Sequence, residues 1–220
     1  MEKKESLKKE NNSAAKISGL SNKAFGIIKF ILGICLLPFV YSSSVSFLSE
    51  FTLINKLLQN YFWWGVISLL IIYLIIWEPT IIYVRGQKLV EIIFTFFKPL
   101  VKVAPALLPV YTIVLFILYS LLSFIFKSDS LIKHFIFLFG FSMALHLIFS
   151  AKTVRSKQGD FLKANYIFGF SLVYIINLIL LAFGLNLIFK EFSIVNFFNK
   201  SFQIANNIFY AVFKQLFLNK

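Results

Sequence analysis

Four polar side chains fall close together in a strongly apolar stretch of the chain, between Pro79 and Pro99. They are Arg85, Gln87, Lys88 and Glu91. Polar and ionisable groups at membrane depth are costly to desolvate, so such a cluster is where a membrane protein is expected to act. Gln87 and Glu91 are four residues apart, about 40° around a helix, and therefore share a face. Two zinc-binding histidines would need that same spacing, yet neither position is His. The pattern marks a functional position without indicating a reaction.

The composition is that of a membrane protein. Hydrophobic residues make up 59% of the 220 residues and charged residues only 14%, whereas a soluble domain is nearly half apolar and about a quarter charged. The excess apolar surface is expected to face lipid. Cys35 is the only cysteine, which excludes an intrachain disulfide and a cysteine-rich metal site within this sequence.

Five runs without Asp, Glu, Lys or Arg are each close to the length that crosses a bilayer as a helix. They cover residues 30–49, 57–77, 103–126, 135–151 and 164–189. We therefore predict an all-α, polytopic membrane protein with about five transmembrane helices. The polar segment 79–99 is expected to form a re-entrant or interfacial helix. Pro105 and Pro109 are expected to break or kink the third span at its start.

Three regions follow from this pattern. Residues 1–23 are polar and rich in Lys, Glu, Asn and Ser, which predicts a disordered basic cytoplasmic tail. Residues 24–190 form the predicted transmembrane domain. Residues 191–220 place apolar side chains on one helical face and polar ones on the other, which indicates an amphipathic helix in the interface plane. Docking of that helix on the bundle or on another subunit is an equal alternative.

Lysine and arginine counts orient the chain. Residues 1–29 carry seven, 85–102 four and 152–163 four, while the intervening segments carry fewer. The positive-inside rule then predicts a cytoplasmic N-terminus and, with five spans, an outside C-terminus. The lysines beyond residue 189 argue mildly for the cytoplasmic side at the C-terminus. The net charge of +13 indicates attraction to lipid headgroups and not to nucleic acid, because the basic residues are scattered over loop ends.

Short motifs around the polar cluster resemble a known family. Leading into the cluster are Tyr61–Gly65, Trp77-Glu78-Pro79 and Ile82-Tyr83-Val84-Arg85-Gly86. This stretch is similar to the approach to the zinc motif in site-2-protease-like intramembrane metallopeptidases, in an uncharacterised bacterial branch where Pro and Tyr-Val-x-Gly precede His-Glu-x-x-His. The resemblance implies a bacterial cytoplasmic membrane protein.

The resemblance continues downstream and covers about residues 60–190. That branch has an Ala-Pro…Pro-x-Tyr-Thr segment, which is matched by Ala104-Pro105, Pro109 and Tyr111-Thr112. Comparable residues also occur at the positions of His146, Gly159-Asp160 and Tyr174…Asn177.

The residues of the zinc motif itself are replaced by residues of other types. Residues 87–91, Gln-Lys-Leu-Val-Glu, occupy the His-Glu-x-x-His position. The family mechanism needs two imidazoles to hold zinc and a glutamate to activate water, whereas Gln87 is a weak ligand and Lys88 is a cation. Three ligands would require Glu91, His146 and Asp160 to converge. The resemblance therefore implies a degenerate member with no catalytic residue, no bound metal and no cofactor.

The leading functional hypothesis is a non-catalytic membrane protein that binds or positions another membrane protein or subunit in the lipid bilayer. Segment 79–102 and the C-terminal helix would be its contact surfaces, with Arg85, His146 and Asp160 as a possible polar site. One alternative is an active intramembrane metalloprotease with substituted ligands. Another is a small transporter or channel subunit with a polar path lined by Arg85, Lys88 and Glu91.

The simplest alternative assigns these residues no special role. Arg85 and Lys88 would then snorkel from an interfacial helix into the headgroup region. His146 would bond to a hydroxyl one helical turn away, on Ser142 or Ser150.

Overall fold

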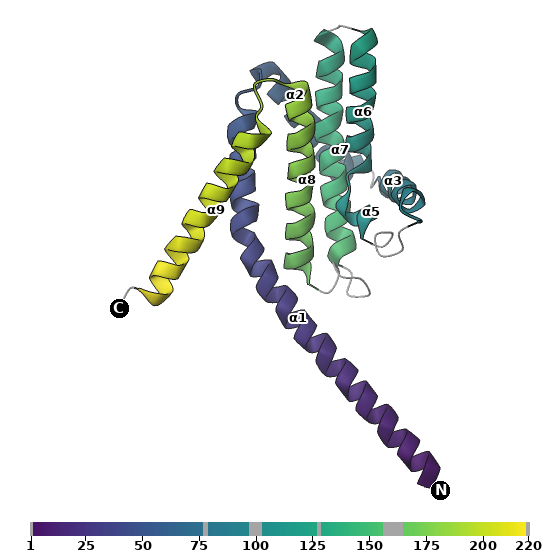
Figure 1. Ribbon diagram of the computed structural model, residues 1–220. Coiled ribbons are helices and arrows are strands. Elements are labelled where there is room, and N and C mark those ends of the chain that lie inside the picture. The colour runs from purple at the N-terminus through teal and green to yellow at the C-terminus, as the bar shows by residue number, and fades with distance from the viewer. Residues whose placement is uncertain (1, 77–78, 97–102, 127–128, 156–164, 219–220) are drawn as a thin grey trace.

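The computed structural model describes residues 2–76, 79–96, 103–126, 129–155 and 165–218, and for residues 2–23 it describes the backbone only. In these ranges all regular secondary structure is helical, and there is no strand. The predicted all-α class is confirmed. Figure 1 shows the long helices gathered side by side, with one end of α1 projecting far beyond them.

The helices follow the apolar runs of the sequence. In chain order they are α1 (Glu2–Phe51), α2 (Lys56–Ile71) with a π-helical continuation (Ile72–Ile76), α3 (Thr80–Ile93), α5 (Ala104–Leu107), α6 (Val110–Ile125), α7 (Asp129–Arg155), α8 (Tyr166–Ile188) and α9 (Ile194–Phe217).

Four stretches of the described helices are long and apolar enough to cross a membrane. They are Ala24–Phe51, Lys56–Ile75, Ser130–Arg155 and Tyr166–Ile188. The helix Val110–Ile125 is also apolar but shorter, since the predicted third span is interrupted before Val110. The chain is therefore an integral membrane protein built as a polytopic helical bundle.

The helical state of residues 2–23 differs from the disordered tail that their composition predicts. These residues continue the first span as one helix, α1. The helix has its physical basis in Lys and Glu, which make up nine of these 22 residues and favour helix, together with the low cost of extending a helix that already exists.

Helix α7 lies at the centre of the bundle. It packs against α2, α6 and α8, and the main core includes the fully buried side chains of Phe139, Leu181 and Leu185. The backbones of α2 and α7 approach closely because each presents a glycine: a methyl group on Gly65 would collide with the carbonyl of Phe137, and one on Gly140 with the carbonyl of Phe62. Small residues permit such close packing between membrane helices.

Two helices depart from the common direction of the bundle. Helix α3 is seen nearly end-on in Figure 1, across the direction of α6, α7 and α8, and it contacts α5, α6 and α7. This placement fits an interfacial or re-entrant helix. Helix α9 begins at the end of the bundle where α1 finishes, packs beside the last part of α1 and diverges from it toward the C-terminus.

Candidate functional site

The site forms around a break in the third apolar run. Pro105 lies in the single turn of α5, and Pro109 precedes α6. Proline has no N–H, and the N–H of Val110 donates to the carbonyl of Leu108 at 3.0 Å instead of to Ala106. The break therefore deprives the carbonyl of Ala106 of its helical partner.

Side chains from other helices take the place of the missing backbone donors. The Ser150 hydroxyl donates to the carbonyl oxygen of Ala106 at 3.1 Å, and His146 Nε2 lies 3.2 Å from the same oxygen. The next carbonyl, that of Leu107, accepts from Asn177 Nδ2 at 3.0 Å. Helices α7 and α8 thus satisfy the freed backbone, as buried polar groups in a membrane require.

Helix α3 is attached to this network by two tyrosines. The hydroxyl of Tyr83 lies 3.2 Å from Ser150 Oγ and accepts from Gln87 Nε2 at 2.7 Å. Burial raises the pKa of the Tyr83 phenol, so this hydroxyl keeps its proton at neutral pH. From α6, the Tyr111 hydroxyl donates to the carbonyl of Ile82 at 2.6 Å. Gly86 leaves room for the Tyr111 ring, because a Cβ there would lie 2.8 Å from it.

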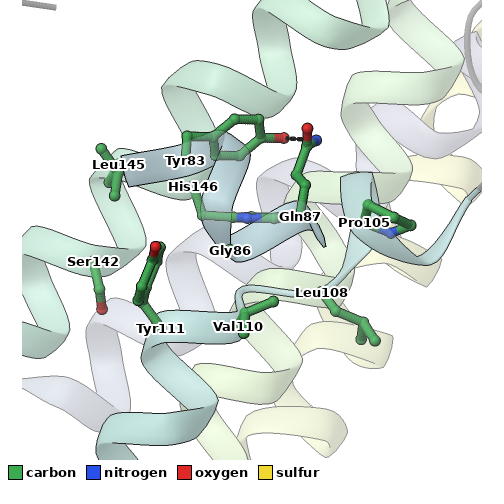
Figure 2. Close-up of a pocket in the computed structure, with 10 residues that line it drawn as sticks. All are labelled: Tyr83, Gly86, Gln87, Pro105, Leu108, Val110, Tyr111, Ser142, Leu145 and His146. Carbon is green, nitrogen blue, oxygen red and sulfur yellow. Dashed lines mark hydrogen bonds between the residues drawn. The ribbon is translucent and has the colours of Figure 1, made fainter. Parts of the chain in front are cut away.

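These elements enclose a small cavity, shown in Figure 2. Its volume is about 10 Å³, close to what one water molecule needs. Its walls come from α3, α5, the α5–α6 connection, α6 and α7, and consist of Tyr83, Gly86, Gln87, Pro105, Leu108, Val110, Tyr111, Ser142, Leu145 and His146.

Of the candidate site residues predicted from sequence that lie in the described part of the chain, the structure brings only two together. Gln87 and His146 line the same cavity. Arg85, Lys88 and Glu91 are exposed on the outer side of α3, and Asp160 lies outside the described residues. Among the described residues, no three His, Cys, Asp or Glu side chains are grouped so that they could hold a metal ion.

The predicted role of His146 as a bundle histidine bonded to a nearby hydroxyl is confirmed for one of its two candidate partners. Ser150 Oγ lies 3.1 Å from His146 Nε2. Ser142 instead pairs with Thr112, 2.9 Å away on α6.

Sequence reasoning missed the two residues, Tyr83 and Ser150, that connect α3 to the carbonyl of Ala106. Tyr83 entered only as part of a family-like motif, and Ser150 only as a possible neighbour of His146. The signal that could have found them is the proline pair, because a broken helix at membrane depth requires side-chain donors from its neighbours.

A second polar cluster holds α9 against the end of α1. Glu50 is fully buried, and its Oε1 lies 2.7 Å from Lys200 Nζ. Lys200 also donates to Ser49 Oγ at 2.9 Å, and the backbone N–H of Ser193 donates to the other carboxylate oxygen at 3.4 Å. Sequence analysis did not single out Glu50, because it lies just beyond an apolar run and its partner is distant in the chain.

Comparison of the chain with protein-family models, with curated proteins and with solved structures gives no match. The resemblance to site-2-protease-like metallopeptidases therefore stays a prediction from sequence motifs.

Proposed function

We propose that this integral membrane protein is a non-catalytic relative of the site-2-protease-like metallopeptidases that binds or positions another membrane protein. One observation carries the non-catalytic part of the proposal. The polar groups next to Gln87 are engaged in maintaining the fold, since Ser150 and His146 both bond the carbonyl oxygen of Ala106. The Ser150 hydroxyl and one of the two ring nitrogens of His146 are thereby committed to the backbone, so His146 offers a metal at most its Nδ1.

The number and type of possible ligands support the same conclusion. A catalytic zinc takes three protein ligands and keeps one position open. Gln87 and His146 are two, and the first is a neutral amide with little affinity for zinc. Glu91 is four residues further on, but it is exposed on α3 while Gln87 lines the cavity.

The space at the site also argues against proteolysis. The cavity of about 10 Å³ accommodates no more than about one water molecule. A protease must seat an extended peptide segment beside its metal, which requires a cleft several residues long.

The outer side of α3 offers a surface that suits a membrane partner. Arg85, Lys88 and Glu91 are exposed there, and they are flanked by the exposed apolar side chains of Ile81 and Ile92. Charges of both signs within an apolar surrounding give specificity to a contact, while the apolar residues supply packing against another helix.

Site-directed photo-crosslinking in native membranes tests the contact. A photoreactive residue in place of Lys88 is expected to give one discrete heavier product. The matched control replaces Phe124 of α6, which is 84% exposed and lies on another helix, and is expected to give none. Equal labelling of diverse proteins from both positions would contradict a specific contact.

Metal analysis of the purified protein tests the non-catalytic part separately. We expect no stoichiometric zinc after purification in zinc-containing buffer. Stoichiometric zinc that is lost in Gln87→Ala or Glu91→Ala would overturn the proposal in favour of a metalloprotease with substituted ligands.

A further inference from the structure

Helix α9 runs into the membrane alongside α1. Lys200 bonds Glu50 at the end of the first span. Nine residues further on, the Phe209 ring packs against Phe39 of α1, with 5.6 Å between ring centroids. Phe39 lies about 18 Å along the helix from Phe51, where the first span ends. The stretch of α9 between residues 200 and 209 therefore lies at the depth of the apolar part of α1.

This stretch carries three amide side chains that point away from α1. The face of α9 that packs on the bundle includes the buried residues Phe197 and Ala205. Gln203, Asn206 and Asn207 lie on the other side of the helix and are exposed. We call these three residues the amide face.

An amide exposed to hydrocarbon is unfavourable, because its donors and acceptor lose water and gain no partner. Helix α9 is also not among the described helices that are long and apolar enough to cross a membrane. A helix with these properties is stabilised at membrane depth when another helix hydrogen-bonds its polar side.

We propose that the amide face of α9 is the contact between two copies of this chain. Each amide group carries both donors and an acceptor, so the amide face is complementary to itself across a two-fold axis. Residues 201–213 contain no charged side chain, and Lys200 is paired with Glu50. Two copies can therefore meet along this stretch without repulsion between like charges.

The proposal is independent of the function proposed above. It concerns α9, whereas the contact with another membrane protein is assigned to α3 on a different part of the bundle. Either can fail without the other.

Cysteine crosslinking of the full chain in phospholipid vesicles tests the contact. Cys35 is exposed, so the variants are made in a Cys35→Ser background. Gln203→Cys is expected to form a disulfide-linked product with twice the 25.4 kDa mass of the chain on mild oxidation. Val212→Cys is the control, because Val212 is 47% exposed and points about 180° away from Gln203 around the helix. It is expected to remain monomeric.

A second variant separates dimerisation from folding. Gln203→Leu combined with Asn206→Leu makes α9 more apolar and so favours its place in the membrane. We expect native mass spectrometry to find the dimer in the parent chain and only the monomer in this variant. The proposal is overturned if the parent chain is monomeric, if the leucine variant stays dimeric, or if both cysteine positions crosslink equally.

Discussion

His146 Nε2 lies 3.2 Å from the carbonyl oxygen of Ala106, forty residues earlier in the chain. A carbonyl oxygen only accepts, so this ring nitrogen is placed to donate. The same nitrogen lies 3.1 Å from Ser150 Oγ. The imidazole thus forms a hydrogen bond with a backbone carbonyl at the break between α5 and α6. This bond explains why a histidine is tolerated inside an apolar span.

The hydroxyl of Ser150 is expected to contribute strongly to stability. Ser150→Ala removes one of the two side chains that bond the Ala106 carbonyl and one hydrogen-bond partner of the Tyr83 hydroxyl, so two buried hydrogen bonds are lost. We expect a loss of about 1–3 kcal/mol in the free energy of unfolding, measured by denaturation in mixed micelles. Ser120→Ala is the control, because Ser120 is exposed and bonds only within its own helix. Equal losses in both variants would contradict the assigned role.

The ion pair between Glu50 and Lys200 is expected to respond asymmetrically to mutation. Glu50 is fully buried, whereas the Lys200 side chain is 44% exposed. Lys200→Met leaves a buried carboxylate without its partner and is expected to cost about 3–5 kcal/mol. Glu50→Gln leaves a lysine that can reach water and should cost markedly less. Thermal unfolding in detergent compares the two, and a larger effect for Glu50→Gln would refute this account.

The close approach of α2 to α7 predicts a glycine-specific effect. In Gly140→Ala the added methyl group meets the backbone carbonyl of Phe62, so the helices must separate. We expect a destabilisation of about 1–3 kcal/mol. Gly26→Ala has nothing within 4 Å of the new methyl, and alanine favours helix over glycine, so it should be neutral or stabilising. Both variants are measured by the same unfolding assay.

The orientation of the chain can be tested with a membrane-impermeant thiol reagent. Lys88 and Lys56 are both exposed and lie on α3 and at the start of α2. In a Cys35→Ser background, we expect Lys88→Cys to be labelled only from the cytoplasmic side and Lys56→Cys only from the opposite side. Labelling of both positions from one side would contradict the predicted orientation.

The spans and the helix break were predictable from sequence because each has a local cause. Uninterrupted apolar runs of sufficient length form helices in lipid whatever surrounds them, and prolines at 105 and 109 interrupt a helix through their own chemistry. The helical state of residues 2–23 was not predicted, since composition alone does not include the effect of an adjoining helix.

The partners within the site were not predictable because they depend on distant parts of the chain. Tyr83 and Ser150 are separated by 67 residues, and Glu50 and Lys200 by 150. A charge count or a periodicity contains no information on which helices become neighbours. The meeting of Gln87 and His146 in one cavity was likewise not predicted, because the two residues lie on different helices, α3 and α7.

The satisfied break between α5 and α6 also makes the third span dependent on later parts of the chain. The carbonyls of Ala106 and Leu107 are hydrogen-bonded by His146 and Asn177, which follow by 40 and 70 residues. Without such donors the two carbonyls would be unsatisfied in lipid. The broken third span is therefore stable in the membrane only as part of the assembled bundle, and not as a helix that inserts by itself.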